Sequence, residues 1–113
     1  MQAKLAYAIK FVASMPDAVA YHRDKLGLPL KFQSPEWTEF ATGDVTLALH
    51  AASADNPAGS MQLGYAVDDL TSLYENRAKN GIDFTSAPRT QHGAMLAKFR
   101  DNEGRECSIS GKR

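Results

Sequence analysis

The 113-residue sequence has little of several features that commonly mark a function class. Its single cysteine, Cys107, excludes an internal disulfide and gives no sign of an oxidising compartment. Basic and acidic residues balance at 13 each, so there is no positive excess to neutralise the phosphates of a nucleic acid. No apolar run approaches the length of a membrane-spanning helix. These absences predict a soluble, cytoplasmic single domain with neither nucleic-acid nor membrane partners.

Residues that could carry metal or covalent chemistry are also few. The histidines are His22, His50 and His92, and no two Cys or His residues have the spacing of a zinc-ligand pair. No Ser-His-Asp or Cys-His arrangement supports a catalytic nucleophile. No glycine-rich phosphate loop is present, so nucleotide cofactors have no support. We therefore expect neither a cofactor nor a catalytic residue of these kinds.

The chain does contain an internal repeat. The stretch from 51 to 60 (AASADNPAGS) consists of small, polar and turn-forming residues, and we interpret it as a linker between residues 1–50 and 61–113. In both halves a strand is followed by a helix and then three strands, and Val12 corresponds to Val67. The sequence thus predicts an α+β domain of two tandem βαβββ modules, with curved mixed sheets around a cavity and helices on the outer faces.

In the first half, Ser14 is the expected helix cap and Gly27 the expected stop. The apolar stripe of this helix is Met15, Val19, His22 and Leu26. Strands are expected at 5–12, 29–33, 37–41 and 45–50.

In the second half, Asp68 and Asp69 cap a helix that ends at Asn80-Gly81, with a stripe of Leu70, Leu73, Tyr74 and Ala78. Strands are expected at 61–67, 82–85, 94–99 and 106–110. Residues 87–93, with His92, are expected to form a loop.

Four segments together resemble the vicinal oxygen chelate superfamily, which includes glyoxalase I, bleomycin resistance proteins and extradiol dioxygenases. They are YAIKFVASM (7–15), AYHRDKLGL (20–28), WTEF with GDVTLALH (37–40 and 43–50), and FRDNEG (99–104). The resemblance covers nearly the whole chain and implies the paired-module fold. Because fold alone does not determine function, the site residues need separate consideration.

Metal-dependent members of that superfamily use four ligand positions, on the first and last strands of each module. The resemblance places Tyr7, Ala48, Gln62 and Ser108 there. This set holds one common ligand type and no formal negative charge, so we expect no metal. An alternative set, shifted by two residues on two strands, is His50, Gln62 and Glu106.

Strand alternation and the superfamily register select the ligand-lining candidates. Tyr7 and Phe11 share a face of the first strand, and Trp37 shares a face with Glu39 while Phe40 points under a helix. The expected ligand-binding residues are Tyr7, Phe11, Trp37, His50, Gln62 and Ser108.

The function favoured by this sequence is metal-independent binding of a small apolar or aromatic molecule, to sequester or sense it. Two alternatives stay open: a metal-dependent lyase or dioxygenase with the shifted ligand set, and a structural or interaction module whose pocket is filled by its own side chains. The resemblance also implies a homodimer, with modules that pair within or between chains.

Overall fold

The computed structural model describes residues 2–91 and 93–111. The chain divides into two compact units: an N-terminal unit, Ala6–Gln62, and a C-terminal unit that runs from Leu63 onward and includes the first residues up to Leu5. The predicted linker therefore lies inside the N-terminal unit. The reason is that the Phe11 N–H donates to the Ser60 carbonyl (2.9 Å) and the Gly59 N–H to the Phe11 carbonyl (2.8 Å).

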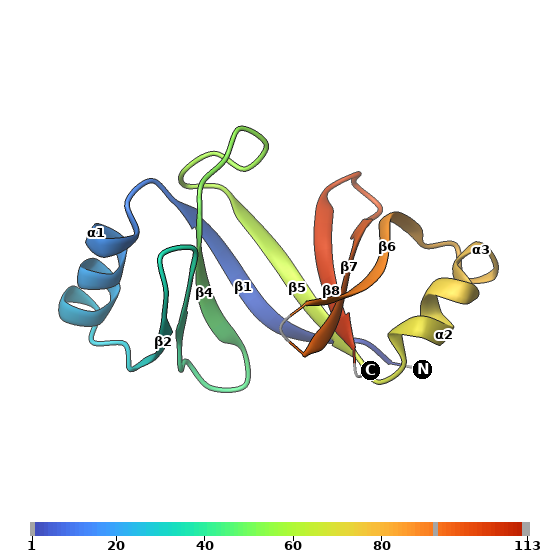
Figure 1. Ribbon diagram of the computed structural model, residues 1–113, viewed down its shortest axis with the longest axis horizontal. Helices are drawn as coiled ribbons and strands as arrows, with labels where there is room; N and C mark the ends of the chain where they lie inside the picture. The colour runs from blue at the N-terminus through green and yellow to red at the C-terminus, as the bar shows by residue number, and fades with distance from the viewer. Residues whose placement is uncertain (1, 92, 112–113) are drawn as a thin grey trace. The chain divides into compact units, whose positions relative to one another are not determined.

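Both predicted modules are present, each with the order strand, helix, three strands (Figure 1). The first contains β1 (Lys4–Val12), α1 (Met15–Ala20), the π-helical segment η1 (Tyr21–Lys25), β2 (Leu30–Gln33), β3 (Trp37–Phe40) and β4 (Thr46–Ala51). The second contains β5 (Met61–Val67), α2 (Leu70–Glu75), α3 (Arg77–Asn80), β6 (Asp83–Gln91), β7 (Ala94–Arg100) and β8 (Glu106–Gly111).

The strands of the two units have the same connectivity. Their spatial order is β2-β3-β4-β1 in the first and β5-β8-β7-β6 in the second, so the first strand of each module lies beside its last. The β1–β4 and β5–β8 pairs are parallel, and the other pairs within each unit are antiparallel. The predicted α+β class with mixed strand pairing is confirmed.

The first helix begins where the sequence predicts, and its predicted apolar stripe is buried except at its last residue. The Ser14 side chain accepts the Asp17 N–H (3.3 Å), and Met15, Val19 and His22 are buried. The prediction for Leu26 is wrong, because its side chain is 54% exposed. The π-helical segment η1 has wider turns than an α-helix, which shifts the phase of the residues that follow it.

The second helix is shorter than predicted. Asp69 caps α2 by accepting the Ser72 N–H (3.0 Å), and Leu70 and Leu73 are buried as expected. The helix breaks at Asn76, so the single stripe predicted through Ala78 is wrong, and Ala78 is exposed on α3.

The strand predicted at 82–85 continues instead to Gln91. It pairs with β7 up to Gln91 opposite Ala94, so most of the loop expected at 87–93 is strand. Pro88 lies in a register irregularity between Ser86 and Arg89, on β6, which pairs with β7 and is at the end of the strand order. Proline is tolerated at such bulged edge positions because no ladder hydrogen bond is needed from it. The expectation for His92 lies outside the described residues.

Each unit has its own apolar core between its strands and its helix. In the N-terminal unit Phe40 and Leu49, both fully buried, pack with Val12, Met15 and Val19. The corresponding core of the C-terminal unit is Val67, Leu70, Leu73, Ala97 and Ile109. The prediction that Phe40 lies under a helix is confirmed.

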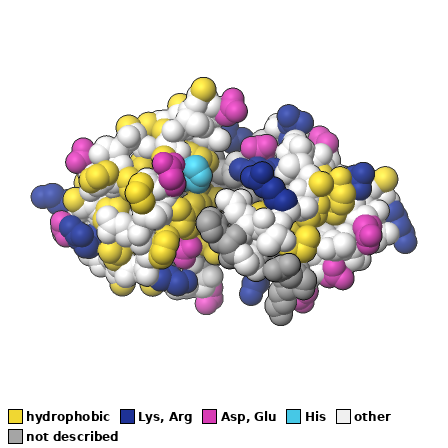
Figure 2. Space-filling view, viewed as in Figure 1, with side chains coloured by type: hydrophobic (Ala, Val, Ile, Leu, Met, Phe, Trp, Pro, Cys, Tyr) yellow, Lys and Arg dark blue, Asp and Glu magenta, His cyan; other side chains and the backbone are white. Residues whose placement is uncertain are grey.

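Charges of both signs are interspersed on the face shown in Figure 2. Within residues 2–91 and 93–111, the helices fall short of the length and apolar character needed to cross a membrane.

Candidate functional site

The N-terminal unit presents a second sheet face, on the side away from α1. Val12 packs against α1, so alternation along β1 places Tyr7, Ile9 and Phe11 on the opposite face. Ile9 and Phe11 form a second buried cluster with Ala48, against which Tyr7 and Trp37 pack. We call this surface the aromatic face. Its residues are Tyr7, Ile9, Phe11, Trp37, Glu39, Ala48 and His50.

Strand register arranges the aromatic face in rows across β3, β4 and β1. One row is Trp37, His50 and Phe11, and the next is Glu39, Ala48 and Ile9. Ala48, whose side chain ends at Cβ, therefore occupies the middle of the face. Ala48 is fully buried, so the larger side chains around it cover it.

Four ring side chains of the aromatic face contact one another. The Tyr7 and Trp37 ring centroids are 5.9 Å apart at 65°, and those of Trp37 and His50 are 6.0 Å apart at 85°. Phe11 and His50 are 5.2 Å apart at 49°. Edge-to-face pairs of this kind contribute about 0.5–1.5 kcal/mol each beyond the area they bury. The rings thus form one connected group.

The lower layer of the face is buried and the upper layer is partly exposed. Ala48 is fully buried and Phe11 is 3% exposed, whereas Tyr7, Trp37 and His50 are intermediate. Tyr7 and Trp37 come from strands on either side of β4, and their rings meet over Ala48. A ligand would therefore contact ring surfaces rather than the sheet backbone.

Glu39 is the carboxylate of this face. Its Oε2 accepts the indole N–H of Trp37 at 2.7 Å, which fixes the orientation of that ring. Its Oε1 lies 3.7 Å from Lys31 Nζ on β2. Burial, and secondarily the negative charge of Glu39, raise the pKa of the Tyr7 hydroxyl above its ordinary value, so Tyr7 is neutral at physiological pH.

His50 has a defined tautomer. Its Nδ1 lies 2.8 Å from the carbonyl oxygen of Ala51, and a carbonyl can only accept, so Nδ1 carries the proton. In the neutral ring Nε2 is then an acceptor, available to an N–H or O–H group of a ligand.

The six predicted ligand-binding residues do not all lie in one unit. Tyr7, Phe11, Trp37 and His50 belong to the aromatic face, and Gln62 is buried at the end of the same unit. Ser108 belongs to the C-terminal unit, on β8. Glu39 was not among the predicted residues, although alternation along β3 already placed it on the face of Trp37.

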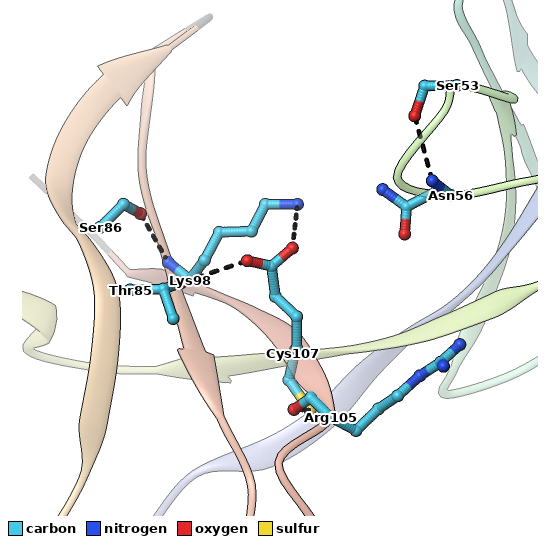
Figure 3. Close-up of polar contacts among 8 residues, drawn as sticks. Ser53, Asn56, Thr85, Ser86, Lys98, Arg105 and Cys107 are labelled. Atoms are coloured by element: carbon cyan, nitrogen blue, oxygen red, sulfur yellow. Dashed lines mark hydrogen bonds and ion pairs between the residues drawn. The ribbon is translucent and has the colours of Figure 1, made fainter.

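The C-terminal unit has a different second face. Ile109 packs on the core, so Ser108 and Ser110 point to the side away from α2. Nearby, Glu106 accepts the Thr85 hydroxyl (3.2 Å) and lies 4.0 Å from Lys98 Nζ. Ser86 Oγ accepts the Lys98 backbone N–H at 3.0 Å (Figure 3). This surface, which we call the polar face, is built from hydroxyls and an exposed ion pair.

The residues at the superfamily's ligand positions do not fit a divalent cation. Ala48 has no donor atom, and Tyr7 is held in its neutral form. Among the described residues, no group of three His, Cys, Asp or Glu side chains could hold a metal ion. The donor chemistry therefore disagrees with a metal at these positions.

A separate hollow of about 610 Å³ opens in the N-terminal unit where β1 and α1 meet the turn between β2 and β3. It is lined by Val12, Ala13, Ser14, Met15, Pro16, Gln33, Ser34, Pro35 and Ala51. None of the predicted ligand-binding residues lines this hollow, so the hollow and the aromatic face are different surfaces of the unit.

Solved structures resemble this fold at low sequence identity. Methylmalonyl-CoA epimerase from Mycobacterium tuberculosis is 17% identical, with a TM-score of 0.78 over 96% of this chain and 87% of that one. A hypothetical protein from Bacillus halodurans C-125 is 14% identical, with a TM-score of 0.77 over 100% and 96%.

A glyoxalase/bleomycin resistance protein/dioxygenase superfamily member from Vibrio splendidus 12B01 is 15% identical, with a TM-score of 0.67 over 99% of this chain and 100% of that one. At such identities the likeness supports the fold and not the activity. Among curated proteins, none matches this chain.

The family model of the Glyoxalase/Bleomycin resistance protein/Dioxygenase superfamily matches residues 4–107, almost the entire chain. That match agrees with the two βαβββ modules and with the resemblance carried by the sequence segments. The chain belongs to the Glyoxalase/Bleomycin resistance protein/Dioxygenase superfamily.

Proposed function

We propose that this protein binds a small, flat aromatic or apolar molecule on the aromatic face, without a metal. The observation that carries the proposal is the connected group of rings at Tyr7, Phe11, Trp37 and His50 on a face that the unit's helix does not cover. Aromatic walls with a few convergent polar atoms are typical of small-molecule sites. The polar atoms here are His50 Nε2, the Tyr7 hydroxyl and the Glu39 carboxylate.

The exposure of each residue on this face decides whether it can touch a ligand or only supports those that do. Trp37 and Tyr7 are partly exposed and offer ring surfaces for stacking, whereas Phe11 and Ile9 are buried and support them. Glu39 holds the indole in place before a ligand arrives, which lowers the entropy lost on binding. Gln62, at the end of the same unit, is a further proposed contact, taken from the superfamily register.

Fluorescence provides the direct test, because Trp37 is the only tryptophan. Titration with a panel of planar aromatic compounds should shift or quench its emission with saturation. The Trp37→Phe variant, followed by calorimetry with the same compound, should bind about three- to tenfold more weakly, because the smaller ring loses contact area. A flat response across the panel favours the alternative of a structural module with a filled pocket.

Metal independence has its own test. Elemental analysis of protein purified without chelator should give clearly less than one equivalent of Zn, Ni, Mn or Fe per chain. One tightly held equivalent, lost in the His50→Ala variant, would instead favour the metal-dependent lyase or dioxygenase with His50, Gln62 and Glu106.

We also propose that the working unit is a homodimer in the cytoplasm. The strands β2 and β6 each have a single strand neighbour, and both are largely exposed along their length. Such edges are commonly covered by another chain. Light scattering across a dilution series should give twice the 12.3 kDa chain mass, and a mass near 12.3 kDa throughout would contradict the dimer.

A further inference from the structure

The aromatic face contains one formal charge at neutral pH, that of Glu39, among the residues assigned to it above. Glu39 lies at the β3 end of the row that continues through Ala48 to Ile9, and its side chain is 18% exposed. One of its oxygens is occupied by the Trp37 indole N–H, at 2.7 Å. A largely desolvated carboxylate is costly unless charge or hydrogen bonds compensate it, so the second oxygen favours a cationic neighbour.

Lys31, the ion-pair partner of the second Glu39 oxygen, is held only weakly. Lys31 Nζ lies 3.7 Å from Glu39 Oε1, beyond normal hydrogen-bond distance, and the Lys31 side chain is 58% exposed. Exposed pairs of this kind contribute little to stability because water screens the ammonium and its chain must be ordered. Lys31 is therefore an exchangeable counter-ion that a ligand can displace.

The rings around Glu39 provide a second source of attraction for a positive charge. Trp37 and Tyr7 are electron-rich rings within contact of each other, and both are partly exposed. A cation over such ring surfaces is attracted by their negative faces, most strongly when it is shielded from water. A carboxylate that also orients the indole brings both attractions to the same place.

We infer that the molecule bound by the aromatic face is a planar organic cation, with its charge beside Glu39 and its rings on Trp37 and Tyr7, in place of the Lys31 ammonium. This inference rests on the proposed function and adds the charge of the ligand to it. A neutral ligand of the same shape would stack on the same rings but would leave the Lys31–Glu39 pair intact.

The test compares N-methylquinolinium, a permanent cation, with quinoline, which is neutral at mildly alkaline pH. Isothermal titration calorimetry at that pH should show the cation binding about tenfold more tightly than quinoline. Glu39→Gln should remove this preference, so that the ratio of the two affinities falls to about one, because the negative charge is lost while the glutamine carbonyl can still accept the indole N–H. Lys31→Gln should strengthen cation binding about two- to threefold, since the competing ammonium is gone.

Glu75→Gln is the matched control, because it removes the same charge from an exposed position on α2 and should leave both affinities unchanged. Equal binding of the two compounds by the unchanged protein, or an equal loss of both in Glu39→Gln, would overturn the inference while the proposed function stands. If neither compound bound and the aromatic panel also gave no response, the proposed function itself would fail.

Discussion

The two units of this chain have one connectivity and two different second faces. Both pair their first and last strands in parallel and pack an apolar core against a helix. Away from the helix, the N-terminal unit has the connected rings of the aromatic face, and the C-terminal unit has the hydroxyls and ion pair of the polar face. The helix-covered face must be apolar for each unit to fold, whereas the second face is free to specialise.

If the helix-covered core stabilises each unit, removing a large core side chain should lower the free energy of unfolding more than any substitution outside the cores. Phe40 is fully buried between β3 and α1, and Phe40→Ala should lower the free energy of unfolding by about 3–5 kcal/mol. Chemical denaturation measures this. Leu70→Ala, at an equally buried site of the other unit, should cost about 2–5 kcal/mol. A loss near zero at either position would contradict the shared role of these cores.

The C-terminal unit has a close approach between strand and helix that can be tested next. A Cβ added at Gly111 would lie 2.5 Å from Leu70 Cβ and 3.1 Å from the Leu70 backbone nitrogen. Gly111→Ala should therefore force β8 and α2 apart and cost about 1–3 kcal/mol of unfolding free energy. Ser108→Ala, on the same strand but on the side away from α2, is the control. Equal stability of Gly111→Ala and wild type would contradict the close packing.

The difference between the second faces predicts unequal effects on ligand binding. Trp37→Ala should weaken binding of an aromatic ligand at least about tenfold, because it removes the indole ring of the aromatic face and leaves Glu39 without its indole donor. Ser110→Ala on the polar face should leave affinity within about twofold. Calorimetry with the best compound of the panel measures both. Equal effects would mean that the aromatic face is not the distinguishing site.

A smaller effect concerns pH. The pKa of Tyr7 is raised above 10.0, first by burial and then by Glu39, so the folded protein keeps the phenol proton longer than the unfolded chain does. The stability that Tyr7 contributes is thus fully present below pH 10.0 and is lost as pH rises above that value. Tyr7→Phe should flatten this decline in denaturation midpoints measured across alkaline pH. The same steepness in the variant would show that Tyr7 does not cause it.

The C-terminal unit has a comparable group in Cys107. Burial, with Asp101 as the second cause, raises the pKa of this thiol, so little thiolate is present near neutral pH. Alkylation of the native protein should be slow and should become fast in denaturant, as followed by mass spectrometry. Rapid labelling of the native protein would show that the β7–β8 turn opens readily.

Much of the fold could be predicted because its signals are local. Ser14 and Asp69 mark helix starts through their capping side chains, and the alternation of Trp37 and Phe40 assigned their faces correctly. The predictions that were wrong depend on packing or backbone geometry for which the local sequence contains no signal. The π-helical segment η1 turned Leu26 to solvent, and pairing with β7 extended β6 beyond its β-forming residues through Pro88.

The features of the candidate site also separate into those predictable from local sequence and those set by packing. The sequence by itself determined the two modules, the aromatic residues on alternate positions of β1 and β3, and the poor metal-ligand set, because period, capping and donor chemistry are properties of local residues. Only the tertiary structure decided that Tyr7 and Trp37 meet over Ala48, that Glu39 binds the indole, and that Lys31 is its counter-ion. These contacts depend on strand register, which is fixed when β1 pairs with β4 of the distant β3–β4 hairpin and the apolar face of these strands packs on α1.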